Sequence, residues 1–399
     1  MSNLFWVKNL LGAPLSAECA AALDDNTINA ILTEAADQGV FCLAYNALKP
    51  YFSDACLAKW KPTYYSLKTQ NILNDRCHKK LHGIMTSAGI PYVIIKGMAS
   101  AKYYPVPEAR MMGDVDFLVA HDQVTAAEDA LKAAGMRRTE TEENGFHESF
   151  SDGNTILELH WAPPGVPPEG ETGDKVREFL SDIIDKAVMY DGYFVPSDFH
   201  HCIILLLHSV SHMTTGGMGL RHLCDWAVFA DSFSSDAFVS EFESPLKSIG
   251  MWEFARVLTA VSVKYLGTGE RPWAAGVDGG TIDLLMQDII DAGNFGVKDD
   301  QRLNQAKLMR DDTNREIETA GMGKILFTNL TVRARRAMPI TAKVPVLLPI
   351  GWAYIGLRHI FRIVTGRKEK IDIKKTVQGA EKRRELYNRL RLFESSDES

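Results

Sequence analysis

Apolar residues in the first part of the chain recur every three to four positions, which is the spacing of amphipathic helices. The pattern is clearest over residues 15–48 and 66–88. It gives way at Pro91 to Ile95, a short run rich in β-branched residues that ends at Lys96-Gly97. Such a run predicts a strand that leads into a turn or a helix start.

Strand-like and helix-like segments then alternate, before helical patterns return for the rest of the chain. The expected strands include one that carries Asp114 and Asp116, followed by strands over residues 136–141, 146–151 and 155–161. The expected helices cover residues 122–134, 197–213, 220–233, 244–266 and 280–292, and a Pro- and Gly-rich surface loop covers residues 163–173.

This order of elements predicts an α+β fold, in which a small mixed β-sheet core lies between helical N-terminal and C-terminal parts. We expect a helical N-terminal region over residues 1–88, an α/β core over residues 89–195 and a helical domain over residues 196–330. We also expect residues 331–399 to form a basic, partly apolar helical segment with an acidic tail.

Composition narrows the class of protein. The 399 residues carry a net charge of −7, which argues against a protein whose whole surface clamps nucleic acid. The six cysteines form no C-x-x-C pair, so their spacing indicates neither a zinc cluster nor a disulfide framework. The first residues lack the basic and apolar segments of a secretory signal, and we expect a cytoplasmic, reducing location.

Asp114 and Asp116 are the most informative pair of residues. Side chains alternate across a strand, so two residues at this spacing point to the same side. Two adjacent carboxylates repel each other unless a cation lies between them, and Mg²⁺ is the usual cation where phosphates are also bound. The pair therefore favours phosphoryl or nucleotidyl transfer.

Glu158 supplies a third carboxylate on a later strand. If that strand lies beside the one that carries the Asp pair, the three carboxylates converge as two-metal nucleotidyl transfer requires. Asp114 and Asp116 would bridge the ions, and Glu158 would complete one metal site and help to deprotonate the attacking hydroxyl. The alternative is that Glu158 is a strand-edge acid paired with Lys or Arg.

Several stretches together resemble a known family. The chain is similar to the uncharacterised bacterial nucleotidyltransferases of the DNA polymerase β-like superfamily, and the similarity covers roughly residues 15–240. It is carried by Ile95-Lys96-Gly97, by Arg110 and Gly113-Asp114-Val115-Asp116-Phe117-Leu118-Val119, by Glu158-Leu159-His160-Trp161, and by the helical stretch that contains His208, His212, Arg221 and Asp225.

The resemblance implies a nucleotidyltransferase fold, a nucleoside triphosphate (NTP) donor and Mg²⁺ or Mn²⁺. In the wider superfamily, a Gly-Ser pair at a helix start holds the triphosphate. This chain has Gly97-Met98 instead, with Ser100 three residues after the glycine. The departure suggests that Lys96 or Arg110 supplies the positive charge.

The residues around the acidic pair each have an alternative interpretation. Lys96 is either a phosphate ligand or a solvated strand end. Arg110 suits phosphate oxygens because its guanidinium is a planar fork, and its alternative is a salt bridge to Asp114 or Asp116. His160 faces the same side as Glu158 by alternation, where it would orient Glu158, contact nucleotide, or form a hydrogen bond within the sheet.

His208 and His212 have the i, i+4 spacing of many zinc ligands. Residue 209 is serine, so the H-E-x-x-H signature of metalloproteases is absent, and paired core histidines are the favoured interpretation. If functional, the two histidines would face the cleft and touch substrate. Arg221 and Asp225 lie one turn apart, which predicts an ion pair within the helix.

The C-terminal segment is basic. Residues 331–384 hold 14 Lys and Arg against 3 Asp and Glu. A basic, apolar helix of this kind can lie on an anionic membrane surface, through residues 340–384 in this chain, or bind a phosphate-rich partner. The alternative is a helix that closes a domain and exposes a basic face.

The leading hypothesis is a metal-dependent nucleotidyltransferase that transfers a nucleoside monophosphate (NMP) to a hydroxyl or phosphate of an unknown acceptor, whether protein, RNA, small molecule or saccharide. One alternative is an inactive nucleotide-binding or interaction protein on the same fold, favoured by Gly97-Met98. Another is a membrane-peripheral enzyme of envelope polysaccharide biosynthesis.

Overall fold

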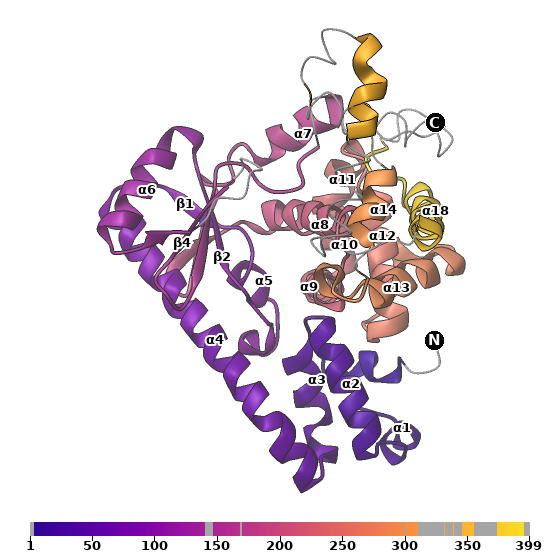
Figure 1. The fold of residues 1–399 in the computed structure, drawn as a ribbon. Coiled ribbons are helices and arrows are strands. Elements are labelled where there is room, and N and C mark those ends of the chain that lie inside the picture. The colour runs from indigo at the N-terminus through magenta and orange to yellow at the C-terminus, as the bar shows by residue number, and fades with distance from the viewer. Residues whose placement is uncertain are drawn as a thin grey trace.

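The computed structural model describes residues 4–139, 147–167, 170–299, 301–309, 331, 338, 345–354 and 373–394. Figure 1 shows a sheet on one side of the molecule and a body of helices on the other, with a long helix running from the N-terminal helices to the sheet. The helices around the sheet and before it are α1 (Ala17–Ala21), α2 (Asp25–Asp37), α3 (Phe41–Leu48), α4 (Asp54–Ser87), α5 (Met98–Ala101), α6 (Val124–Ala133) and α7 (Glu171–Leu180). The later helices are α8 (Asp198–Thr214), α9 (Leu220–Asp231), α10 (Ser235–Phe238), α11 (Ser244–Ser248), α12 (Trp252–Val261), α13 (Gly279–Ala292), α14 (Arg302–Met309) and α18 (Ile373–Leu390).

The N-terminal part of the described chain is helical, as the three- to four-residue spacing predicts. Side chains satisfy free N–H groups where three of these helices begin, and Ser16 does so for Cys19 at the start of α1. The side chain of Asp24 accepts a hydrogen bond from the backbone N–H of Thr27 at the start of α2. Ser53 does the same for Cys56 at the start of α4. Helix α4 has 34 residues, and at 1.5 Å per residue it spans roughly 50 Å.

The main sheet has five strands in the order β1-β2-β5-β4-β3. Strands β2 and β5 are parallel, and the other neighbours are antiparallel. The strands are β1 (Tyr92–Ile94), β2 (Val115–Val119), β3 (Arg137–Arg138), β4 (His147–Ser151) and β5 (Ile156–His160), and a separate hairpin joins β6 (Val188–Tyr190) to β7 (Tyr193–Val195). The expected α+β class is confirmed.

The two faces of the sheet have different surroundings. Val115 and Phe117 of β2 pack in one hydrophobic cluster with Leu81 of α4 and Leu131 of α6. Leu118, on the opposite face, belongs to the larger cluster formed with the helical part of the molecule. Since side chains alternate along a strand, Asp116 lies on the face that looks toward the later helices.

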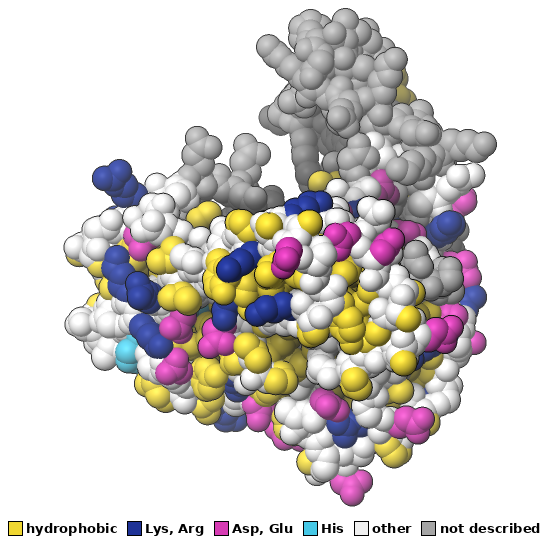
Figure 2. Space-filling view, turned by 90° about the horizontal axis from the view of Figure 1, so that it is seen from below, with side chains coloured by type: hydrophobic (Ala, Val, Ile, Leu, Met, Phe, Trp, Pro, Cys, Tyr) yellow, Lys and Arg dark blue, Asp and Glu magenta, His cyan; other side chains and the backbone are white. Residues whose placement is uncertain are grey.

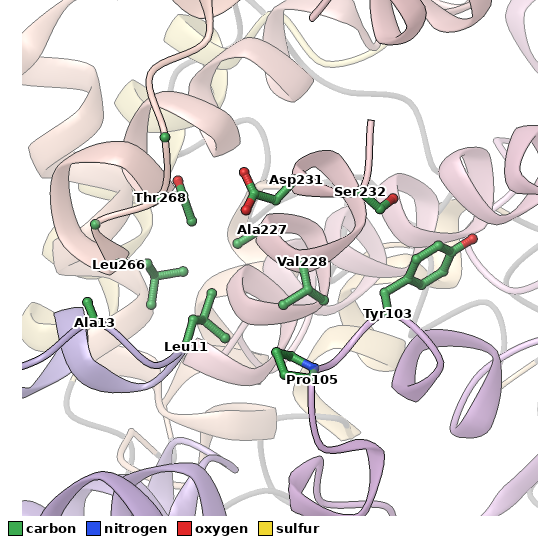
Figure 3. Close-up of a pocket in the computed structure, with 12 residues that line it drawn as sticks. Leu11, Ala13, Tyr103, Pro105, Ala227, Val228, Asp231, Ser232, Leu266 and Thr268 are labelled. Carbon is green, nitrogen blue, oxygen red and sulfur yellow. The ribbon is translucent and has the colours of Figure 1, made fainter. Parts of the chain in front are cut away.

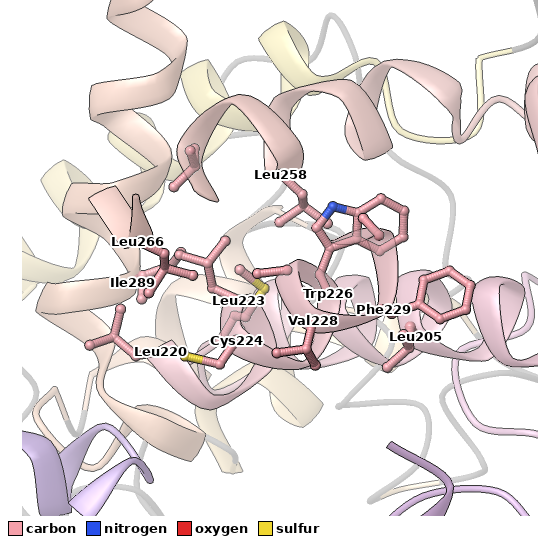
Figure 4. Close-up of a cluster of buried hydrophobic side chains, with 14 of the residues drawn as sticks. Leu205, Leu220, Leu223, Cys224, Trp226, Val228, Phe229, Leu258, Leu266 and Ile289 are labelled. Carbon is pink, nitrogen blue, oxygen red and sulfur yellow. The ribbon is translucent and has the colours of Figure 1, made fainter. Parts of the chain in front are cut away.

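The helical part is built around α9. Its buried side chains Trp226 and Phe229 pack with Leu205 of α8, Leu258 of α12 and Ile289 of α13 (Figure 4). Burial on this scale fixes the orientation of α8 and α9, since close-packed side chains leave few alternative arrangements. The later helices therefore form a rigid support opposite the sheet.

Two expected elements differ from those observed. The helix expected over residues 244–266 is broken into α11 and α12, because Gly250 adopts a positive φ of 63°. The backbone of Phe393 packs against Gly250 and donates a hydrogen bond to its carbonyl oxygen. The loop expected over residues 163–173 ends early, since α7 begins at Glu171. The hairpin β6–β7 has no counterpart in the expected elements.

Seen from below, the described surface mixes apolar, basic and acidic side chains over both the sheet and the helical part (Figure 2). Among the described helices, none combines the length and the apolar character needed to cross a bilayer. Residues 340–344 and 355–372 of the predicted membrane contact lie outside the described residues.

Candidate functional site

The parallel pairing of β2 with β5 places Asp116 directly opposite Glu158. This is the strand neighbourhood on which the three-carboxylate hypothesis depends. The side chain of Asp116 is 1 % exposed and that of Glu158 is 22 % exposed. One carboxylate is therefore buried at the base of the site, while the other remains accessible to solvent and to a substrate.

Asp116 has two cationic or donor partners. The Lys96 Nζ lies 2.5 Å from Asp116 Oδ1, and His160 Nε2 lies 3.0 Å from the same oxygen. The backbone N–H of Ile95 donates to the carbonyl of Asp116, which holds Lys96 beside β2. His160 Nε2 also lies 3.3 Å from Glu158 Oε2. His160 thus links two of the carboxylates, on the side that strand alternation predicts.

The charges of this group support one another. Burial alone would raise the pKa of Asp116, but the Lys96 ammonium and the hydrogen bond from His160 outweigh burial and lower it. Burial opposes the charge of Lys96 and His160 in the same way, yet Asp116 raises the pKa of both. An ionised carboxylate only accepts hydrogen bonds, so His160 Nε2 carries a proton and donates a hydrogen bond to Asp116.

Asp114 immediately precedes β2, which begins at Val115. Its pKa is raised to about 6, first by the charge of Asp116, then by burial and by Glu158. Like charges raise the pKa of a carboxyl group in this way when no cation separates them. Asp114 therefore lies close enough to Asp116 and Glu158 to feel both charges, and a divalent cation would relieve this repulsion.

The donor set fits a divalent cation. Ligand atoms of Asp116, Glu158 and His160 lie within 4.8 Å of one another. Carboxylate oxygens are the ligands that Mg²⁺ and Mn²⁺ prefer. Because His160 Nε2 holds a proton for Asp116, we assign His160 to the orientation of the carboxylates rather than to direct ligation.

The loop that carries Asp114 is held by buried side chains of α4. The amide of Asn71 donates to the carbonyl oxygens of Glu108 and Arg110 and accepts from the backbone N–H of Met112. Asn74 donates to the carbonyl oxygen of Met112. A long helix thus fixes the approach to β2, which periodicity alone did not indicate.

Gly97 adopts φ 58° and ψ −112°, a conformation that residues with a side chain avoid. Ser100 is buried in α5, and its backbone N–H donates to the carbonyl of Gly97. The N–H groups of Ala99 and Ala101 are also bonded within this turn. Gly113 has a different character, since no described atom lies within 4 Å of the position that its Cβ would take.

Arg110 is buried and forms an ion pair with Asp225 of α9, rather than with Asp114 or Asp116. Its Nε and Nη2 donate to the two oxygens of Asp225 at 2.7 Å each. The prediction of an ion pair between Arg221 and Asp225 is wrong, because the Asp225 carboxylate instead contacts Arg110 and the hydroxyl of Tyr104. The phosphate contact of Arg110 stays a prediction, and this geometry favours a structural role.

A model of the uncharacterised nucleotidyltransferase family matches residues 24–267. The chain belongs to this family. No curated protein matches the chain. The match to the family spans both the sheet with its carboxylates and the helices α8 and α9.

Two residues of α9, Arg221 and His222, have neighbours that the sequence did not indicate. Arg221 was assigned to Asp225, yet its guanidinium lies over the ring of Phe295, with 5.0 Å from Cζ to the ring centroid. His222 joins His208 and His212 in a cluster of three imidazoles. The turn after α8 was the available signal, since a short connection brings consecutive helices side by side.

A cavity of about 300 Å³ lies elsewhere in the structure (Figure 3). It is lined by residues that include Leu11, Tyr103, Val228 and Thr268. None of its lining residues belongs to the carboxylate group. The only lining carboxylate, Asp231, is paired with Arg271. This cavity therefore adds no chemistry to the site.

Proposed function

We propose that this protein is a metal-dependent nucleotidyltransferase that moves an NMP from an NTP to a hydroxyl or phosphate acceptor, on a DNA polymerase β-like fold. The observation that carries the proposal is the position of Asp116 opposite Glu158 in the parallel β2–β5 pair, with Asp114 next to both charges. Membership of the uncharacterised nucleotidyltransferase family supports the same reaction class.

Asp114, Asp116 and Glu158 are the residues that would hold Mg²⁺ or Mn²⁺. The bound ions would neutralise charge on the triphosphate, lower the pKa of the attacking hydroxyl and stabilise the negative charge of the leaving pyrophosphate. Asp116 is the buried anchor of the set, because Lys96 and His160 keep it ionised. Asp114 must release the proton that its raised pKa retains below about pH 6.

Glu158 is the best placed of the three to exchange protons with an acceptor. Like Asp114 it is partly exposed, and His160 on the same strand lies within 3.3 Å of it. His147 of the neighbouring strand lies 4.0 Å from its other oxygen. In our proposal Glu158 receives the proton of the acceptor hydroxyl, while His160 keeps the carboxylate aligned.

A second candidate function is a nucleotide-binding or interaction protein without turnover. One observation favours it, since the N–H groups of Ala99, Ser100 and Ala101 are bonded within the turn after Gly97. Backbone donors there are less available to a triphosphate than in a Gly-Ser turn. The membrane-peripheral alternative involves residues 340–384, of which only 345–354 and 373–384 are described.

The experiment that tests the proposal is a screen of the full chain with the four α-labelled NTPs against protein, RNA, lipid and polysaccharide fractions. We expect one NTP to label one fraction in the presence of Mg²⁺, with no label from the Asp116→Asn variant. The matched control is Asp122→Asn, a nearby aspartate outside the carboxylate group. Labelling that persists in Asp116→Asn would contradict the mechanism, and tight NTP binding without labelling of any fraction would favour the second candidate.

A further inference from the structure

A cluster of nitrogen donors lies where α8 and α9 meet. We call Arg221, His222, His208 and His212 the α8–α9 basic cluster. His208 and His212 contact each other through their Nε2 atoms at 2.7 Å. The ring centroid of His222 lies 5.1 Å from that of His208 and 4.7 Å from that of His212. Phe295 closes one side, 4.9 Å from the ring of His212.

Two donors of this cluster are buried without a hydrogen-bond partner among the described residues. They are Nε of Arg221 and Nε2 of His222. The backbone N–H of Gly219 donates to Nδ1 of His222, so the neutral ring carries its proton on Nε2. A buried donor without an acceptor destabilises the protein, because it has lost its hydrogen bonds to water. An acceptor that enters the cluster would recover that loss.

The backbone at the start of α9 does not supply these donors. Gln38, the residue that follows α2, accepts from the N–H of Leu220 through its side-chain oxygen and from the N–H of Arg221 through its backbone carbonyl. The N–H of His222 donates to the carbonyl of Gly219. The free donors are therefore side chains of Arg221 and His222, placed by the packing of α9 rather than by its N-terminus.

The basic cluster lies beside the carboxylates. An Nη1 of Arg221 lies 3.5 Å from the carbonyl oxygen of Met111, in the loop that leads to Asp114. The charge of Arg221 acts on Asp114, and the charge of Lys96 acts on His208 and His212. Burial and these neighbouring cations lower the pKa of all three histidines, so each is neutral at pH 7.

A transition metal is a weaker occupant for the same atoms. The three histidines bring their ligand atoms within 4.8 Å of one another, a spacing that Zn²⁺ also uses. However, His222 holds a proton on Nε2, and Arg221 adds a positive charge nearby. Both features disfavour a dication and favour an oxyanion, since neutral imidazole N–H groups and a guanidinium are donors.

We propose that Arg221 and His222, beside the hydrogen-bonded His208–His212 pair, bind a polyphosphate group, which is either the β- and γ-phosphates of the NTP or a phosphate on the acceptor. The inference rests on the proposed function for its choice of ligand. In this arrangement Arg221 takes the part that the sequence assigned to Arg110, and Phe295 and Gln38 hold it in place. The cluster supplies the positive charge that the turn after Gly97 lacks.

The test is binding of inorganic pyrophosphate to the full chain by isothermal titration calorimetry, with Mg²⁺ at one fixed concentration. We expect Arg221→Gln to weaken binding by tenfold or more, on the order expected for loss of a charge-assisted hydrogen bond. His222→Phe, which removes the Nε2 donor and keeps an aromatic ring, weakens it to a smaller extent. Arg177→Gln on α7 is the matched control and leaves binding unchanged. Thermal melts of each variant show whether the fold is retained.

Further ligands separate the sources of the phosphate. If the β- and γ-phosphates of the NTP occupy the cluster, Arg221→Gln weakens the binding of both ATP and pyrophosphate and leaves the binding of AMP unchanged. If an acceptor phosphate occupies the cluster, Arg221→Gln weakens the binding of pyrophosphate but not the binding of ATP. Equal pyrophosphate affinity in wild type and a folded Arg221→Gln variant overturns the proposal. So does stoichiometric Co²⁺ binding with tetrahedral absorption bands that His208→Asn abolishes. The calorimetry measures binding without turnover, so it can succeed even if the protein is not a transferase. If pyrophosphate binding depends on Arg221 but the protein never transfers NMP, the proposed function is contradicted and the binding site is not.

Discussion

Arg110 and Asp225 form a buried, bidentate ion pair that joins the loop before β2 to α9. Both contacts are 2.7 Å long, and the side chains are 5 % and 3 % exposed. The hydroxyl of Tyr104 donates to the same carboxylate at 2.8 Å. Asp114 lies in the loop before β2 and Arg221 lies on α9, so the ion pair between these two elements fixes the position of Asp114 relative to Arg221. It therefore sets the geometry between the carboxylates and the α8–α9 basic cluster.

Removal of one partner of this pair leaves the other as an uncompensated buried charge. We expect Arg110→Met to lower the free energy of unfolding by about 3–5 kcal/mol. Urea denaturation measures the loss, and the double variant Arg110→Met/Asp225→Leu should recover part of it. Wild-type stability in the single variant would show that Arg110 is not structural, and would reopen its assignment to phosphate.

Asp114 makes a prediction about pH. Its pKa of about 6 in the folded protein lies above its ordinary value of 3.8, so protonation favours the folded state between these values. The ionised group therefore destabilises the metal-free protein above pH 6. We expect Asp114→Asn to raise the free energy of unfolding in EDTA at pH 7.5 by on the order of 2 kcal/mol.

That gain should shrink at pH 5, where the wild-type carboxyl group is largely protonated. Urea denaturation at the two pH values gives both numbers. Added Mg²⁺ should stabilise the wild type more than the Asn variant, because it relieves the same repulsion. An Asn variant that is less stable than wild type at pH 7.5 without metal would contradict the repulsion between these carboxylates.

Gly97 and Gly113 are expected to respond differently to the same substitution. Gly97→Ala forces a side chain into a positive-φ conformation and should cost about 1–3 kcal/mol of stability. It would also move Lys96 away from Asp116. Gly113→Ala meets no described atom within 4 Å and should be tolerated. Thermal melts of the two variants make the comparison, and equal melting temperatures would count against the strained turn.

His160 and His147 offer a matched pair of substitutions near Glu158. His160 is buried and donates to Asp116, whereas His147 is 20 % exposed and lies 4.0 Å from Glu158. We expect His160→Gln to lower the rate of NMP transfer by about 10- to 100-fold, the usual effect of losing a residue that orients a ligand. His147→Gln should change the rate far less. The reverse order would assign the orientation of Glu158 to His147.

Local patterns in the sequence predicted much of the carboxylate site. The alternation of apolar and acidic residues placed Asp116 and Glu158 on strands, and each faces the expected side. Their pairing in parallel required the strand order of the whole sheet. That order depends on contacts between distant segments, which alternation within one strand does not specify.

Arg221 shows why the expected ion pair within α9 failed. The i, i+4 rule pairs Arg221 with Asp225, but such a pair is worth only about 0.2–0.5 kcal/mol. A bidentate contact in a buried setting outweighs it, and Arg110 reaches Asp225 across 115 positions of the chain. His222 was missed for a similar reason, because its neighbours His208 and His212 belong to a different helix.

The most direct test of the central claim compares label transfer from α-³²P-NTP and γ-³²P-NTP, using the acceptor fraction found in the screen. The account predicts that only the α label enters the acceptor, that the γ label leaves as pyrophosphate, and that Asp116→Asn abolishes transfer while remaining folded. Transfer of the γ label, or undiminished transfer by a folded Asp116→Asn variant, would contradict it.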